Sequence, residues 1–207
     1  MDDTQNFEKD EAWIGVWARR LSPKFLEYKL QKEHPIRRLV AAKANQIGKN
    51  VLDVGCASCI DYPLHKETGI KYEGLDPTQK FLDRAKKLYP GINVKLGNVL
   101  NMPYDDGVFD VVYCKDLFEH LPPEKYRRAM AEMWRVASKL VMVAFFVSPK
   151  PIETRYELKR TGHWLNHYCK PELIDFFNTL SGFGHLNVTE NIGYNNSALY
   201  EVYKGSE

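Results

Sequence analysis

The chain has 207 residues, the length of one α/β domain with a modest extension. Hydrophobic residues make up 44% and charged residues 27%, which is enough apolar material for one core. The formal charge of +2 is nearly neutral, so a general nucleic-acid-binding surface is not expected. No apolar run approaches the ~20 residues of a membrane span, and the N-terminus is acidic where a signal peptide would be basic. We therefore expect a single soluble, cytoplasmic domain with no membrane partner.

Residues 9 to 47 carry a helical pattern. Side chains of one face recur at helical spacing before and after Pro35, namely Trp13, Val16, Trp17 and Arg20, then Ile36, Leu39, Val40 and Lys43. The pattern predicts that residues 1–47 form an N-terminal helical cover that packs its amphipathic stripe on a sheet.

The stretch from Asn50 to Cys59 reads N-V-L-D-V-G-C-A-S-C. Its first half predicts a short buried parallel strand that ends at Gly55. A strand that ends on glycine lets a ligand approach the backbone, and a helix after it would point free N–H groups at that ligand. A second strand, residues 72–75, ends on Asp76, where nucleotide-binding α/β units place a carboxylate for ribose hydroxyls. We expect both strand ends to share one ligand site.

From residue 78 onward, helical and strand patterns alternate. Helices are expected over 79–89, after Pro123 and over 171–180, and strands over 92–96, 109–113, 140–146, 186–191 and 198–204. Thr78 is expected to cap the first of these helices. Strand, helix and strand follow without interruption up to residue 96, so right-handed crossovers predict an α/β fold with a doubly wound sheet. Residues 147–170 mix basic and aromatic side chains, and they leave the strand end that faces the ligand crevice.

Four motifs, in this order, resemble those of the class I S-adenosylmethionine-dependent methyltransferases. The first, D-V-G-C-A-S-C, is similar to the family's acidic-x-Gly-x-Gly-x-Gly loop, and the second, E-G-L-D-P, is similar to its ribose-binding strand end. The third, G-N-V-L-N-M-P-Y, is similar to the family's adenine-side loop. The fourth, F-D-V-V-Y-C-K-D-L-F-E-H-L-P, looks like the strand and helix start beside the methyl donor. The resemblance implies a seven-stranded, mostly parallel Rossmann-like sheet whose last strand runs antiparallel between the fifth and the sixth. Ala57 and Cys59 replace the second and third glycines, and Asn98 stands where the family usually has aspartate.

The resemblance also implies a cofactor, S-adenosyl-L-methionine, and the residues that hold it. These are Gly55, Cys56 and Ala57 at the methionine moiety with Asp53 supporting the loop, Asp76 at the ribose, Pro77 beside the adenine, Asn98 and Val99 at the adenine edge, and the Lys115 carbonyl at the methionine amine. The single domain then divides into a helical cover (1–47), a cofactor-binding core (48–146), a lid or acceptor loop (147–170) and a C-terminal helix with strands (171–207). In the family the N-terminal segment often covers the ligands, so Trp13, Trp17 or Tyr28 could face them instead of only packing on the sheet.

Methyl transfer from a sulfonium is a direct displacement in which the protein chiefly aligns the reacting atoms, so no metal is expected. A general base is needed only if the acceptor is a poor nucleophile such as a hydroxyl. The candidates expected near the crevice are Asp116, Glu119, His120, His163 and His167. Each histidine also has a structural interpretation. His120 could be a buried residue that supports the fold, and His163 and His167 could be ordinary histidines of a surface lid.

The acceptor class is indicated by what the motifs lack. Nucleic-acid amino-methyltransferases of this fold carry (Asn/Asp)-Pro-Pro-aromatic after the fourth strand, whereas this chain reads C-K-D-L. We therefore expect no nucleic-acid partner and predict O-methylation of a sugar, glycan or other small metabolite. One alternative is a catalytically silent binding module, suggested by the missing loop glycines. A nicotinamide-dependent oxidoreductase is a weaker one, because the loop has no G-x-G-x-x-G.

Cys56 and Cys59 form a C-x-x-C, which could indicate zinc or redox chemistry, but no second close cysteine pair exists. Small thiols that fill a crowded loop explain the pair better. The sequence fixes no oligomeric state.

Overall fold

The computed structural model describes residues 22, 24, 27, 35–149, 153–160, 162–192 and 196–205. The predicted ligand-facing residues Trp13, Trp17 and Tyr28 lie outside this part, as does most of the predicted N-terminal cover. What is described of that cover includes one long helix, α4 (Pro35–Ile47), which leads into the first strand as predicted. None of the helices in the described part has the length and apolar character of a membrane span.

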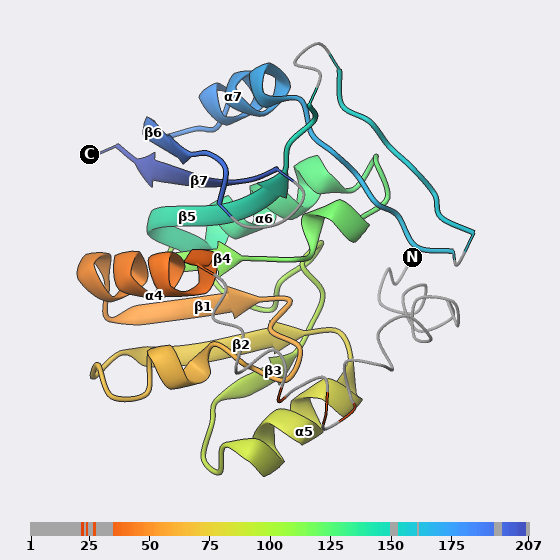
Figure 1. Cartoon of the computed structure of the whole chain (residues 1–207). Coiled ribbons are helices and arrows are strands. Elements are labelled where there is room, and N and C mark those ends of the chain that lie inside the picture. The colour runs from red at the N-terminus through yellow and green to blue at the C-terminus, as the bar shows by residue number, and fades with distance from the viewer. Residues whose placement is uncertain are drawn as a thin grey trace.

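One seven-stranded sheet forms the centre of the molecule (Figure 1). Its strands are β1 (Asn50–Val54), β2 (Lys71–Asp76), β3 (Val94–Leu96), β4 (Phe109–Cys114), β5 (Ala137–Phe146), β6 (Phe183–Thr189) and β7 (Ser197–Lys204). Their order is β3-β2-β1-β4-β5-β7-β6; β7 runs antiparallel to both of its neighbours, and the other pairs are parallel. The predicted fold class is therefore confirmed, and so is the antiparallel last strand that the family resemblance implied.

Helices cover both faces of the sheet, which makes it doubly wound. The core on one face holds Val40 of α4, Leu82 of α5 (Gln79–Leu88) and Val111 of β4. The core on the other face is formed with two further helices, α6 (Tyr126–Val136) and α7 (Lys170–Asn178). The strands can be apolar throughout because both faces are covered.

The connection between β1 and β2 differs from the prediction. No α-helix follows Gly55; residues 55–70 form turns around a short 3-10 helix, η2 (Tyr62–Leu64). Pro63 lacks the N–H that a longer helix would need, and the side chains of Asp61 and His65 are buried among polar partners. The predicted uninterrupted strand–helix–strand alternation is therefore wrong here.

A second correction concerns the cap of α5. Thr78 occupies the N-cap position, but its side chain makes no capping hydrogen bond. Its backbone N–H instead donates to Asp76 Oδ1 (2.9 Å). The carboxylate at the end of β2 therefore orients the start of the helix.

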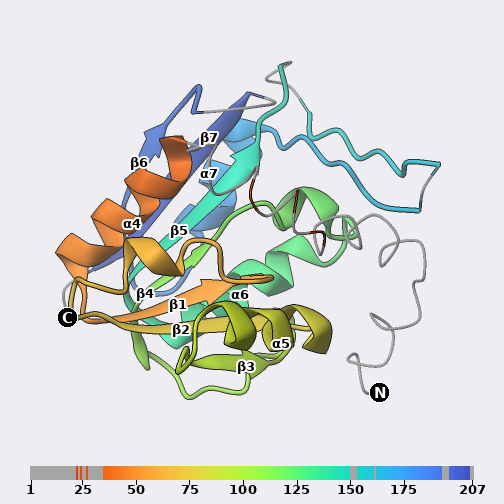
Figure 2. The same ribbon diagram turned by 60° about the horizontal axis from the view of Figure 1, so that its bottom comes forward.

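The predicted lid is a hairpin-like arm in its described part, residues 153–160 and 162–168. Its two sides pair antiparallel, with the Arg155 N–H donating to the His167 carbonyl (2.7 Å) and the Leu165 N–H to that of Glu157 (2.8 Å). Both views show the arm extending beyond the end of the sheet (Figures 1 and 2). At its base, the Tyr168 N–H donates to the Phe146 carbonyl (2.7 Å), which anchors the returning chain on β5.

Candidate active site

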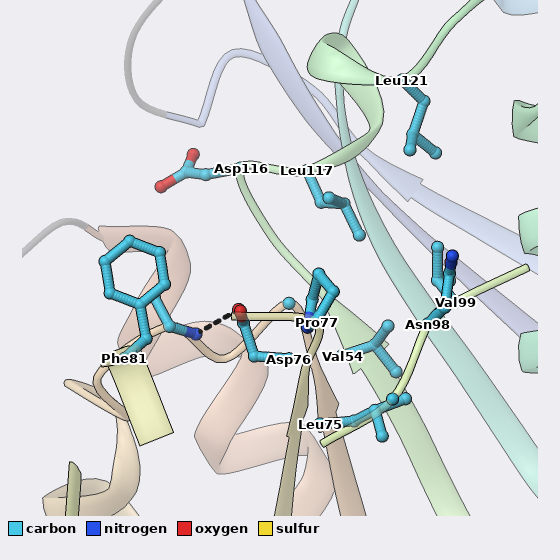
Figure 3. Close-up of a pocket in the computed structure, with 13 residues that line it drawn as sticks. Val54, Leu75, Asp76, Pro77, Phe81, Asn98, Val99, Asp116, Leu117 and Leu121 are labelled. Atoms are coloured by element: carbon cyan, nitrogen blue, oxygen red, sulfur yellow. Dashed lines mark hydrogen bonds between the residues drawn. The ribbon is translucent and has the colours of Figure 1, made fainter. Parts of the chain in front are cut away.

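An open cavity lies where β1, β2 and β4 end, at the carboxyl edge of the sheet. Its volume is about 580 Å³, counting the space open to solvent. It is lined by Val54, Gly55, Ala57, Leu75, Asp76, Pro77, Phe81, Gly97, Asn98, Val99, Asp116, Leu117 and Leu121. Figure 3 shows Asp76 and Phe81 on one side of it and Asn98 and Val99 on the other, with Pro77 between them. The predicted meeting of the first two strand ends at one cavity is therefore what the fold produces.

Asp76 is the best-anchored polar side chain at this cavity. Only 4% of its surface is exposed. The Ala57 N–H donates to its Oδ2 (2.9 Å) and the Thr78 N–H to its Oδ1 (2.9 Å). Burial raises the pKa of Asp76 to about 6, although both backbone donors lower it. One carboxylate thus joins the loop after β1 to the start of α5.

The loop after β1 keeps the backbone of a glycine-rich loop although two glycines are replaced. Gly55 has φ 71°, Ala57 φ 46° and Cys59 φ 54°, all in the left-handed region. The Gly55 N–H donates to the Leu75 carbonyl (2.8 Å), and a Cβ at Gly55 would lie 3.2 Å from Leu117 Cδ2. The left-handed conformation costs an alanine or cysteine about 1–2 kcal/mol each, so Ala57 and Cys59 strain the loop.

Cys56 and Cys59 fill space inside this loop. Both are free and buried, and a Cβ at Gly74 would meet their sulfur atoms at 2.7 Å and 3.0 Å. Burial raises the pKa of the Cys56 thiol well above its usual value, and its hydrogen bond with Cys59 raises it further. The described residues contain no cluster of three or more His, Cys, Asp or Glu side chains suited to a metal. The two thiols therefore act as packing groups here.

Asp53 and Lys115 do not line the cavity; they belong to a buried polar cluster beside it. The Tyr72 hydroxyl donates to Asp53 Oδ2 (2.8 Å), and burial raises the pKa of Asp53 to about 6. The Lys115 ammonium pairs with Asp61, which also pairs with Arg37 of α4. Burial alone would raise the pKa of Asp61, but the two cations hold it below its usual value.

Asp61 and Arg37 were not among the predicted site residues. Their pairing joins segments 24 residues apart, and neither residue stands in a recognisable motif. The only local sign of this pair in the sequence is the carboxylate of Asp61, shortly after the Gly55 loop. A role for the Lys115 backbone carbonyl stays a prediction.

Four of the five predicted base candidates lie outside the cavity lining, and the fifth, Asp116, borders it. Asp116 has φ 56° and is exposed. His120 ends the 3-10 helix η3 (Phe118–His120), whose flanking residues Leu117 and Leu121 both line the cavity.

The ring of His120 has a defined tautomer. Its Nδ1 lies 2.9 Å from the Trp164 carbonyl, which can only accept, so in the neutral ring Nδ1 carries the hydrogen. Nε2 is then the basic nitrogen, and it lies 3.7 Å from Glu119 Oε1. The His163 ring stands edge-on to His120 at 5.9 Å between centroids, so the lid brings two of the predicted histidines together.

His167 lies apart from that pair, against the ring of Phe146 at 6.0 Å between centroids. Its pKa is lowered, mainly by burial and then by the charge of Arg155. Its Nδ1 is buried and has no hydrogen-bond partner among the described residues.

Two further lid residues, which the sequence interpretation missed, hold η3 in place. The buried Asn166 donates from Nδ2 to the Leu121 carbonyl (2.7 Å), and its N–H donates to the Glu119 carbonyl (2.8 Å). The Tyr168 hydroxyl donates to the Phe118 carbonyl (2.7 Å). The lid therefore fixes the turn that carries both His120 and part of the cavity wall.

Comparison with known proteins places this site in context. A protein-family model described as a methyltransferase domain matches residues 52–145. The ubiquinone biosynthesis O-methyltransferase of Pseudomonas fluorescens is 27% identical over 221 residues, covering 98% of this chain and 91% of that protein. The phthiotriol/phenolphthiotriol dimycocerosates methyltransferase of Mycobacterium tuberculosis is 38% identical over 146 residues, covering 64% of this chain; this chain spans only 52% of that relative's length.

Solved structures share the fold over most of the chain. The 1,6-didemethyltoxoflavin-N1-methyltransferase of Burkholderia thailandensis, with bound S-adenosylhomocysteine, superposes with a TM-score of 0.73 at 13% identity, over 100% of this chain and 92% of that one. An amino pentose methyltransferase of Micromonospora echinaspora, bound to S-adenosylmethionine, gives a TM-score of 0.68 at 17% identity, over 86% and 94%. The matched family segment contains the ends of β1, β2 and β4 and every residue that lines the cavity.

Proposed function

We propose that this chain is a class I S-adenosylmethionine-dependent methyltransferase that methylates a hydroxyl group of a small molecule; the methyltransferase-domain model matched over residues 52–145 and the O-methyltransferase matched over nearly the whole chain support this. The observation that carries the proposal is Asp76, a buried carboxylate at the end of β2 that borders the cavity between the Gly55 loop and Asn98.

The described residues fit the family's cofactor. Asp76 would accept hydrogen bonds from ribose hydroxyls, and Gly55 leaves the backbone of the loop open to a ligand. At Gly97 a Cβ would lie 2.6 Å from Leu75 Cδ1 and 3.2 Å from Pro103 Cδ, so a larger residue here would have to displace the Leu75 side chain at the cavity. The Asn98 Nδ2 is a buried donor at the cavity with no partner among the described residues. When bound, S-adenosylmethionine supplies a methyl group activated by the charge of its sulfonium.

For a hydroxyl acceptor, we assign the general base to His120. Its Nε2 is the basic nitrogen in the neutral ring, because the Trp164 carbonyl holds the hydrogen on Nδ1. The hydrogen bonds from Asn166 and Tyr168 hold the turn that carries His120, and its flanking residues Leu117 and Leu121 line the cavity. Asp116 borders the cavity itself and is the alternative base.

Two acceptor classes are supported by different observations. The lid carries the half-buried Trp164 and, opposite His167, the exposed Arg155, side chains that suit stacking on a sugar and hydrogen bonding to its hydroxyls. The relative matched over nearly the whole chain is a ubiquinone biosynthesis O-methyltransferase, and Leu117 and Leu121 give the cavity an apolar wall. The name of this relative and the apolar wall favour a hydroxyl group on a ring compound as the second candidate for the methyl acceptor.

The proposal is tested by incubating the purified chain with S-adenosylmethionine and a panel of sugars and phenols. We expect S-adenosylhomocysteine and a product heavier by one methylene with at least one hydroxyl compound. His120→Gln should slow this reaction, while the matched variant His185→Gln, on the outer strand β6, should leave it unchanged. A chain that binds cofactor but methylates no member of the panel would favour the silent binding module.

A further inference from the structure

The lid holds the turn η3 by its backbone carbonyls. The Tyr168 hydroxyl donates to the Phe118 carbonyl (2.7 Å), and the Asn166 N–H donates to the Glu119 carbonyl (2.8 Å). The Asn166 side chain adds a bond from Nδ2 to the Leu121 carbonyl (2.7 Å), just after the turn. Three carbonyls in and after one short turn thus accept from two lid residues, and Leu121 itself stands on the cavity wall (Figure 3).

The amide of Asn166 has one defined orientation. None of its surface is exposed. The Leu121 carbonyl can only accept, so Nδ2 faces it, and Nδ2 also lies 3.4 Å from the Tyr168 hydroxyl oxygen. The other end of the amide, Oδ1, is buried without a hydrogen-bond partner among the described residues. A buried acceptor without a partner costs free energy, so the contribution of this amide is the pair of bonds that Nδ2 makes.

One further bond joins the lid and η3, in the opposite direction. His120 Nδ1 donates to the carbonyl of Trp164, two residues before Asn166 (2.9 Å). This bond keeps the hydrogen on Nδ1 and leaves Nε2 as the basic nitrogen of the neutral ring. It requires the lid strand and η3 to keep their register, which the side chain of Asn166 fixes at the far end of the turn.

We propose that Asn166 is a positioning residue for methyl transfer, because its Nδ2 holds η3 in register with the lid and so keeps His120 on the Trp164 carbonyl. Asn166 is absent from the cavity lining and acts through His120. The role of His120 as base rests on the proposed function, whereas its ring tautomer can be measured without any reaction.

The first measurement is that tautomer, by ¹⁵N NMR of the whole chain labelled at its histidines, at a pH where the ring is neutral. The His120 signals are those that disappear in His120→Gln. The wild type should carry the hydrogen on Nδ1. Asn166→Leu keeps a side chain of similar size but cannot donate, so it should show a population with the hydrogen on Nε2.

Two matched variants make the result specific. Tyr168→Phe removes only the hydroxyl that donates to Phe118 and should show the same change to a smaller extent, which keeps the test decisive if Asn166→Leu fails to fold. Tyr200→Phe, on β7, also removes a buried hydroxyl, but one without a partner among the described residues. It should retain the wild-type tautomer and the wild-type rate.

The second measurement is turnover of a hydroxyl acceptor from the panel. Asn166→Leu should lower kcat about tenfold, since a misplacement of about 1 Å can cost 10²-fold, and should leave the acceptor KM and the S-adenosylhomocysteine affinity near wild type. In the His120→Gln background the same substitution should change kcat by less than about twofold, because the ring that it positions is gone.

The other outcomes overturn the inference. Hydrogen on Nε2 in the wild type, or an unchanged tautomer in the folded lid variants, would mean that the lid does not set the ring of His120. Equal losses of kcat in both backgrounds would make Asn166 a purely structural residue. No turnover by the wild type would contradict the proposed function itself, and with it the role of the ring as base, whatever the tautomer.

Discussion

Replacing Ala57 by glycine tests whether the loop after β1 is strained. Ala57 has φ 46°, and the left-handed region costs a non-glycine residue about 1–2 kcal/mol. Glycine removes this cost but adds about 0.5–1 kcal/mol of unfolded-chain entropy. The difference predicts that Ala57→Gly raises the free energy of unfolding by about 0–1.5 kcal/mol. Urea denaturation measures it, with S-adenosylhomocysteine affinity, by calorimetry, expected within a few-fold of the wild type.

Two further variants make this reasoning refutable. Ala131→Gly makes the same chemical change on the exposed face of α6, where it should destabilise by about 1 kcal/mol. Cys59→Gly relieves a similar φ of 54° but removes a buried side chain, so it should gain nothing or lose stability. If Ala57→Gly destabilised as much as Ala131→Gly, the loop would not be strained. A hundredfold gain in cofactor affinity on restoring both glycines would mean that the natural loop is defective, favouring the silent module.

Three other outcomes follow from the site. Burial raises the pKa of Asp76 to about 6, so protonation just below neutrality should remove the carboxylate proposed to accept from the ribose. The affinity for S-adenosylhomocysteine should then fall roughly tenfold from pH 7 to pH 5. Calorimetry that gives a constant affinity would exclude the carboxylate as a ligand. Trp164→Ala and His167→Ala should lower turnover on the acceptor and leave cofactor affinity near wild type, whereas full turnover in both would make the lid a surface loop. His120→Gln should cost about 10²–10⁴ in the rate of methylation of a hydroxyl and flatten its pH dependence, and an unchanged rate would move the base to Asp116.

Much of the fold could be predicted because its signals are local. Short apolar runs that end on Gly55 or Asp76 identify parallel strands whose carboxyl ends face a ligand. The helices α5 and α6 follow from one apolar face each. The position of β7 between β5 and β6 came only from the resemblance to a family, because no residue in one strand specifies which strands will flank it.

The missed features depend on contacts between distant segments. Residues 55–70 form turns rather than a helix because Asp61 and His65 find buried partners in α4 and β4. In the same way, nothing local in Asn166 indicates its bond to Leu121, just after η3 and 45 residues away, and nothing local in Tyr168 indicates its bond to Phe118 of η3, 50 residues away. Of the predicted cofactor residues, Gly55, Ala57, Asp76, Pro77, Asn98 and Val99 line the cavity, whereas Asp53, Cys56 and Lys115 do not.

The most direct test is a calorimetric titration of S-adenosylhomocysteine into the wild type and Asp76→Ala. The wild type should show saturable binding with one ligand per chain. Hydrogen bonds to a charged acceptor contribute about 1.5–3 kcal/mol each, so Asp76→Ala should bind at least tenfold more weakly while remaining folded by circular dichroism. Absence of binding by the folded wild type, or equal affinity in the two proteins, would contradict the assignment of this cavity as the cofactor site.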